Sequence, residues 1–194
     1  MKNVVIILIA IVLIFIIKSL FVSVYLVRNR LDTQNFGERF AEINKPYNFS
    51  FTPRHNNLNI IIFPLKNPGL INKNEFTLKI YSQTELIREM KFSGYNIGDS
   101  SDVKFQFEPI ANSGSNALNV EIASNSYQNP IFINTGKDNK PSFRAYFRSL
   151  NKNEAVSDWQ YSWQDRLVQN FPFFIIWIIM LLGIVVWSAR NEKS

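Results

Sequence analysis

Long apolar segments at both ends of the chain constrain its fold more than any other feature. Residues 4–27 contain a single charged side chain, Lys18, and residues 171–187 contain none. About 24 residues at the helical rise span roughly 36 Å, which is enough to cross the hydrocarbon core of a bilayer with some tilt. The second run is close to the lower length limit for a span. The sequence therefore predicts two transmembrane helices, over residues 1–27 and 171–188.

The first apolar run has a second interpretation, a cleaved secretory signal peptide. No small-x-small cleavage motif follows its apolar core, so we expect an uncleaved anchor. Lys2 precedes the first helix, and Arg190 and Lys193 follow the second. By the positive-inside rule this places both termini in the cytoplasm. We expect a two-pass protein of the plasma membrane, with the central segment outside the cytoplasm and a short cytoplasmic tail over residues 189–194.

Between the apolar runs, apolar and polar residues alternate in short stretches. In residues 102–122 the side chains of Val103, Phe105 and Phe107 alternate with polar ones, and a Ser/Gly/Asn cluster leads to a second alternating run. Such period-two alternation predicts strands with one buried face. Residues 85–92 fit either a strand or a short helix. The other runs cover residues 47–51, 58–63, 75–82, 130–134 and 142–150.

Short strands at a spacing of about ten residues are typical of an antiparallel sandwich. We therefore predict an all-β fold, a jelly-roll-like antiparallel β-sandwich over residues 47–150, flanked by the two transmembrane helices. Residues 28–46 are polar and predict a helical or irregular connector that follows the first span.

In residues 151–170 the apolar residues recur at spacings of three and four, which predicts an amphipathic helix. Ser157 and Gln160 have the spacing of a capping box. Aromatic residues just before a membrane span are typical of the water–lipid boundary. Packing of the tryptophans under the sandwich is the alternative explanation. The aromatic residues concerned are Trp159, Tyr161 and Trp163.

The predicted sandwich has a distinctive order of strand and turn positions. The residues that carry it are the stretch FQFEPIANS at 105–113, NNL at 56–58, and Phe51, Leu78 and Ile80. In this order the chain resembles a family of extracytoplasmic jelly-roll domains of bacterial membrane proteins, which are similar to carbohydrate-binding modules. Such domains accompany membrane glycosyltransferases and other cell-envelope polysaccharide machinery. The resemblance implies a domain that handles a glycan or a lipid-linked saccharide, with a membrane glycosyltransferase or another envelope protein as its partner.

The residue inventory argues against an enzyme. The chain has no cysteine and one histidine, His55, which excludes thiol chemistry and a Cys/His zinc site. It contains no nucleophile motif, phosphate-binding loop or dinucleotide-binding fingerprint. We expect a non-enzymatic protein without a cofactor or a metal site, in which His55 is an ordinary exposed or capping residue. Asp99 and Asp102 could offer oxygen ligands to Ca²⁺, but aspartates in a turn are more often turn formers.

The candidate ligand-binding residues are Arg144, Tyr146 and Arg148, which we expect on the outer face of one strand. Guanidinium groups bind carboxylates and phosphates bidentately, so this row could hold an acidic sugar or a phosphate. The alternative is a solvated face with cross-strand ion pairs. Half of the formal net charge of +6 lies in the two tails and at Lys18, so the basic composition does not predict a nucleic-acid surface.

Lys18 lies within the first predicted span, where a charge costs on the order of 3 kcal/mol. Its side chain either extends to the outer headgroups or pairs with an acidic residue of another protein. The second possibility supports an alternative function, in which the chain is a structural subunit or scaffold of a membrane complex and has no ligand of its own.

Overall fold

The structure is a computed structural model that describes residues 16, 18, 26, 28–136 and 138–169. The described residues belong to two compact units, a β domain within residues 27–150 and a unit that contains helix α2. The two expected spans and the cytoplasmic tail lie almost wholly outside the described residues. Within the described part, no helix combines the length and the apolar character that a membrane crossing requires.

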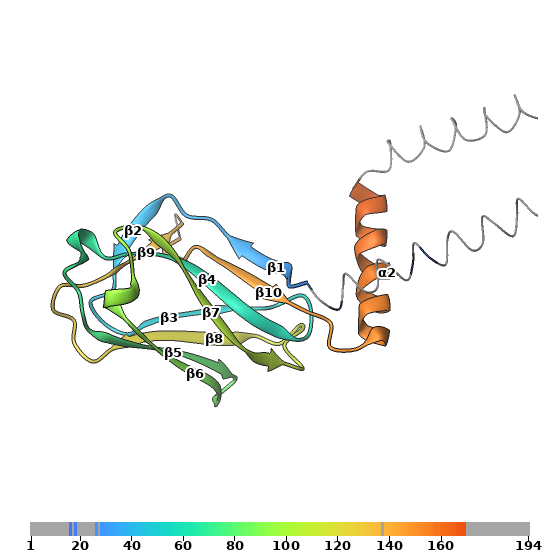
Figure 1. The fold of residues 1–194 in the computed structure, drawn as a ribbon, viewed down its shortest axis with the longest axis horizontal. Helices are drawn as coiled ribbons and strands as arrows, with labels where there is room; N and C mark the ends of the chain where they lie inside the picture. The colour runs from blue at the N-terminus through green and yellow to red at the C-terminus, as the bar shows by residue number, and fades with distance from the viewer. Residues whose placement is uncertain (1–15, 17, 19–25, 27, 137, 170–194) are drawn as a thin grey trace, which may run out of the picture. The chain divides into compact units, whose positions relative to one another are not determined.

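The β domain is a sandwich of two antiparallel sheets (Figure 1). In sheet A the central strand is β4, with β7 on one side and β10 and β9 on the other; β1 pairs with β10, and β2 pairs with β9. Sheet B has the order β3-β8-β5-β6. The strands are β1 (Arg30–Asn35), β2 (Arg39–Glu42), β3 (Tyr47–Phe51), β4 (Leu58–Lys66), β5 (Glu75–Ser82), β6 (Glu85–Ser93), β7 (Ser101–Ile110), β8 (Leu118–Ser124), β9 (Phe132–Thr135) and β10 (Phe143–Phe147).

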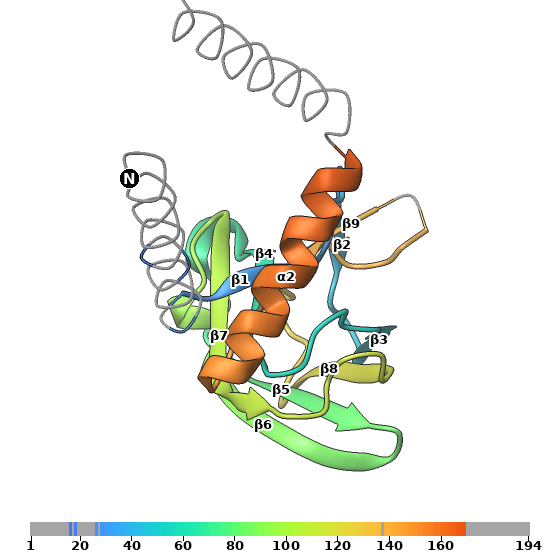
Figure 2. The same ribbon diagram turned by 90° about the vertical axis from the view of Figure 1, so that its right-hand side faces the viewer.

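The core lies between the two sheets and consists of the apolar residues of the alternating runs. Figure 2 shows β1, β4, β2 and β9 of sheet A above the strands of sheet B, while β7 runs down one side towards β6. Phe49 of β3 links the sheets, because its ring lies 5.7 Å from that of Phe63 and 5.6 Å from that of Phe143, measured between ring centroids. Burial of each large apolar side chain contributes about 1.5–3 kcal/mol. The fully buried residues include Leu58, Ile61, Phe63, Leu65, Phe76, Leu78, Ile80, Leu118 and Ile122.

The predicted sandwich is confirmed, and residues 85–92 form a strand within β6 and not a helix. The two alternating runs of residues 102–122 are both strands, but they do not pair with each other. β7 pairs with β4 in sheet A, whereas β8 pairs with β3 and β5 in sheet B. The turn-rich segment 111–117 therefore carries the chain from one sheet to the other.

The prediction of a helical or irregular connector over residues 28–46 is wrong, because this segment contains β1 and β2. The two strands lie along one edge of sheet A, which we call its outer row. There β1 pairs through the backbone with β10, and β2 pairs with β9. Ile43, at 1% exposure, belongs to the core. The sandwich therefore begins well before residue 47. Edge strands with few apolar residues carry little alternation, which explains why the sequence pattern did not reveal them.

The helix expected over residues 151–170 is present as α2 (Lys152–Gln169). Asn151 caps it, because its Oδ1 accepts a hydrogen bond from the Glu154 backbone N at 2.9 Å and its Nδ2 donates to Glu154 Oε1 at 2.9 Å. The predicted capping box of Ser157 and Gln160 is wrong, since the helix begins more than one turn earlier. The membrane-interface role of α2 stays a prediction.

Candidate functional site

The predicted ligand-binding row lies on β10 and just after it, in the interior of sheet A. The core-facing residues of β10 are at most 5% exposed, which leaves Arg144 and Tyr146 on the outer face, both half-buried. Arg148 follows the strand and is exposed. Because β10 is hydrogen-bonded to β1 on one side and to β4 on the other, the backbone that carries these residues is fixed along both edges.

Arg144 forms an ion pair with Asp102 of β7. Arg144 lies opposite Ile62 of β4, and Asp102 lies opposite Pro64, so the guanidinium reaches diagonally across β4. The side chains of Arg144 and Asp102 are 34% and 55% exposed, and such a surface pair contributes about 0–1 kcal/mol. The cross-strand ion pair that we considered as an alternative therefore exists, and it presents hydrogen-bond donors and an acceptor to solvent side by side.

Tyr146 lies in an apolar strip of the same face. Its cross-strand neighbours are Ile60 of β4 and Leu31 of β1. Ile60 is buried, and Leu31 is 44% exposed. An aromatic ring beside a donor–acceptor pair is an arrangement that can contact a ligand with one apolar face and several hydroxyl groups.

The calcium alternative finds no support in the arrangement of acidic residues. Asp102 pairs with Arg144, and Asp99 lies exposed in the loop before β7. In the part of the chain that the structure describes, no three His, Asp or Glu side chains come together as metal ligands would.

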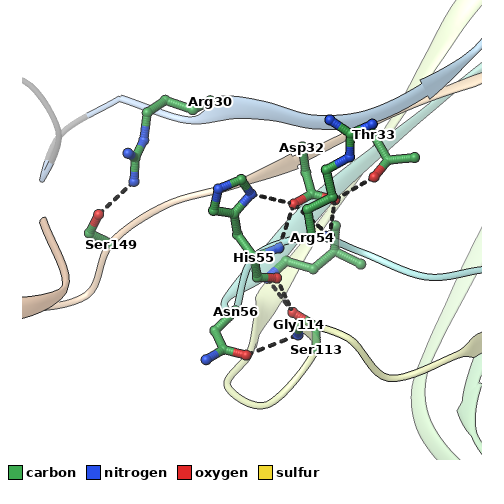
Figure 3. A network of polar contacts seen from close by, with 10 residues as sticks. Arg30, Asp32, Thr33, Arg54, His55, Asn56, Ser113, Gly114 and Ser149 are labelled. Carbon is green, nitrogen blue, oxygen red and sulfur yellow. Dashed lines mark hydrogen bonds and ion pairs between the residues drawn. The ribbon is translucent and has the colours of Figure 1, made fainter. Parts of the chain in front are cut away.

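A polar network that the sequence did not reveal holds the neighbouring ends of β1 and β10 (Figure 3). A β-bulge in β1 leaves Asp32 without a cross-strand partner, and its carboxylate points to the turn before β4. The carboxylate accepts hydrogen bonds from the backbone N of Arg54 at 3.0 Å and of His55 at 2.8 Å, and from Thr33 Oγ1 at 2.7 Å. It also lies 2.8 Å from His55 Nδ1, which must carry the hydrogen because a carboxylate only accepts.

The network keeps Asp32 ionised. Burial by itself would raise the pKa of the Asp32 carboxyl, but the hydrogen bonds from the His55 ring, from Thr33 and from the backbone of Arg54 and His55 outweigh burial and lower its pKa below the usual value. The carboxylate therefore carries its charge in the folded protein near neutral pH.

His55 and Arg30 both contact Phe147, the last residue of β10. The His55 ring stacks on the Phe147 ring at 4.0 Å between centroids with an angle of 4°, and the Arg30 guanidinium carbon lies 4.3 Å from the same centroid. Arg30 also donates to Ser149 Oγ at 2.6 Å. These contacts join β1, the turn before β4 and the end of β10, so the network positions the strand that carries Tyr146.

The remaining predicted site residues lie outside the β domain. Lys18 and Trp159 belong to the other compact unit, and the side chains of Tyr161 and Trp163 lie outside the described part of the structure. Partner contact by Lys18 and the membrane interface of the three aromatic residues stay predictions.

No protein-family model matches this sequence, and no curated protein matches it. Similar solved structures include carbohydrate-binding modules with a β-sandwich fold. One is CsCBM6-3 from Clostridium stercorarium, in complex with cellobiose, with 10% identity, a TM-score of 0.38, and coverage of 63% of this chain and 84% of that one. The C-terminal module of LamC from Zobellia galactanivorans has 10% identity and a TM-score of 0.36, with coverage of 61% and 90%. A module of Cel9A from Ruminococcus flavefaciens has 10% identity and a TM-score of 0.34, with coverage of 60% and 100%. With TM-scores below 0.5, this likeness carries no conclusion about the present chain.

Proposed function

We propose that this chain is a non-enzymatic, membrane-anchored binding module whose sandwich lies outside the cytoplasm and holds a cell-envelope glycan or a lipid-linked saccharide. The observation that carries the proposal is the position of Tyr146 beside the Arg144–Asp102 pair on the outer face of sheet A. A sugar ring has an apolar face that stacks on aromatic rings, and its hydroxyl groups both donate and accept hydrogen bonds. On this face the Tyr146 ring can stack on the sugar ring, and the Arg144–Asp102 pair can donate hydrogen bonds to the hydroxyl groups and accept them.

Arg148 adds a positive charge to the row. It is exposed, and among the residues described its guanidinium has no hydrogen-bond or ion-pair partner. Arg144 is neutralised by Asp102, so Arg148 is the cation of the row that is available to an acidic ligand. Bidentate contact with a carboxylate or a phosphate favours an acidic sugar or a saccharide phosphate over an uncharged chain.

The position of the site in a fixed sheet supports binding without a large conformational change. Strand β10 is hydrogen-bonded on both sides, and the Asp32 network fixes its end. A preorganised site loses little conformational entropy when the ligand binds. The proposal rests on these residues and not on the likeness to solved carbohydrate-binding modules.

The predicted spans over residues 1–27 and 171–188 fit this function. Anchors at both ends would keep the sandwich close to the bilayer, where a lipid-linked saccharide is located. A membrane glycosyltransferase or another envelope protein is the partner that this arrangement would serve, with both termini of the chain in the cytoplasm.

The test is a calorimetric titration of the purified full-length chain with hexagalacturonic acid and with cellohexaose. We expect saturable binding of hexagalacturonic acid, which Tyr146→Ala and Arg144→Ala each weaken at least tenfold, since each variant removes one of the two contact types. Tyr95→Ala is the matched control, because Tyr95 is 74% exposed in the turn Gly94–Asn96 and belongs to none of the strands that carry the proposed site.

A folded chain that binds neither oligosaccharide would contradict the proposal and favour the alternative, a scaffold subunit without a ligand. In that case Lys18→Leu would be expected to abolish formation of the membrane complex. Equal binding by the wild type and both site variants would show that the ligand lies elsewhere on the molecule.

A further inference from the structure

A pocket of about 210 Å³ opens at the corner of sheet A where the outer row changes from β1 to β2. This volume is below the roughly 300–1,000 Å³ of sites for drug-sized ligands. The pocket therefore has room for one small unit, such as a single ring of a longer polymer. It is lined by Phe36, Glu38, Arg39, Thr135 and Gly136.

The base of the pocket is held by close backbone contacts. A Cβ atom at Gly37 would lie 2.3 Å from the carbonyl carbon of Thr135, so only glycine permits this approach. Glu38 N donates to the carbonyl oxygen of Thr135 at 3.1 Å, and Arg39 lies opposite Thr135 in the β2–β9 pairing. The residues that line the pocket are therefore held by the backbone of two paired segments.

The side chains around the pocket are available for binding. Phe36 is 69% exposed, so most of its ring is open to solvent. Glu38 and Arg39 are exposed too, and within the described ranges neither their carboxylate nor their guanidinium has a hydrogen-bond or ion-pair partner. In this they differ from Arg144, whose guanidinium pairs with Asp102.

We propose that this pocket is a second sugar-binding site, which takes one uncharged hexose or N-acetylhexosamine ring of a glycan. The Phe36 ring stacks on the apolar face of the sugar. The Glu38 carboxylate accepts hydrogen bonds from hydroxyl groups, and the planar Arg39 guanidinium donates to two adjacent oxygens. Because the charges of Glu38 and Arg39 are opposite and equal, the pocket favours a neutral sugar ring. The row of Arg144, Tyr146 and Arg148 favours an acidic one. The ligand class rests on the proposed function.

The experiment is saturation-transfer difference NMR, with affinities from titration, on the purified full-length chain with cellohexaose and chitohexaose as probes. We expect Phe36→Ala and Glu38→Gln each to weaken binding of at least one probe tenfold or more. Phe40→Ala is the matched control, since Phe40 is a neighbouring exposed phenylalanine that does not line the pocket. It should bind like the wild type.

The outcomes separate this site from the one on β10. If the neutral probes bind and neither pocket variant changes their affinity, the pocket proposal is overturned while the proposed function stands. An equal loss in the Phe40→Ala variant also overturns it, because the effect is then not specific to the pocket. If no oligosaccharide binds, acidic or neutral, both proposals fail.

Discussion

The Asp32 carboxylate joins segments that are far apart in the sequence. It accepts hydrogen bonds from the backbone of Arg54 and His55, more than twenty residues along the chain, and from the His55 ring, which in turn stacks on Phe147. A buried carboxylate with several donors is stabilised in its charged form. Together with the backbone pairing of β1 with β10, these hydrogen bonds attach β1 to the rest of the sandwich.

We predict that Asp32→Asn lowers the free energy of unfolding at pH 7 by about 1.5–3 kcal/mol, the usual contribution of hydrogen bonds to a charged group. The amide keeps one acceptor oxygen but places an NH₂ group against backbone N–H donors. Urea denaturation followed by circular dichroism measures the change. Asp99→Asn, at an exposed loop position, is the control and should change the stability little.

The same variant should change the response to acid. The pKa of Asp32 is lowered in the folded state, so its contribution is fully present above the unfolded pKa of about 4 and is lost as the pH falls through the lower folded value. The difference in the free energy of unfolding between the wild type and Asp32→Asn should therefore shrink as the pH falls below about 4. A difference that stays constant down to the acid transition would contradict this role.

At the residue scale, the alternation predicts on which face of a strand a side chain lies, but not which residue that side chain contacts. Alternation placed Arg144 and Tyr146 on the outer face of β10 correctly, because the side-chain period of a strand is a local property. The pairing of Arg144 with Asp102 depends on two strand registers across β4, and no local pattern contains that information. For the same reason the sequence indicates only an ordinary histidine at His55, because Asp32, the partner that orients it, lies in a segment whose pattern predicts no strand.

At the scale of elements, most strands were predictable from alternation, and β1 and β2 were not. Sheet B strands such as β5 bury every second residue and show it in the sequence. β1 is a six-residue edge strand with one apolar residue, Leu31, and that residue lies on the outer face. A strand of this kind is held by backbone hydrogen bonds and by Asp32, neither of which leaves a hydrophobic period.

The edge strands lead to a prediction about the minimal folded fragment. A fragment of residues 27–150 should fold as an independent β domain, whereas a fragment of residues 47–150 should not. The shorter one lacks the Asp32 network and Ile43, which together contribute about 3–6 kcal/mol, and it exposes the edges of β9 and β10. Losses of this size are comparable to the total stability of a domain.

Circular dichroism and amide-proton dispersion in NMR spectra distinguish the two fragments. Dispersed spectra for the longer fragment together with collapsed spectra for the shorter one are the expected result. Equal stability of both fragments would show that β1 and β2 are dispensable additions to a sandwich that begins at residue 47.

At the scale of the whole molecule, the fold class followed from strand number and spacing, but the topology did not. β4 pairs with β7, β10 and β9, and consecutive strands β7 and β8 lie in different sheets. Such non-local pairings depend on the packing of both sheets around the shared core and on no single segment. The two predicted spans and the orientation across the membrane remain predictions from the apolar runs and the flanking charges.

The central claim is that the outer face of sheet A binds a glycan, and isoleucine methyl NMR tests it most directly. Ile60 and Ile62 lie on that face of β4, and Ile61 points to the core. We would titrate the full-length chain, with labelled isoleucine methyl groups, with hexagalacturonic acid. Saturable shifts at Ile60 and Ile62 with little change at Ile61 or at Ile80 of sheet B are the predicted result. No shift on the outer face at saturating ligand would contradict the claim.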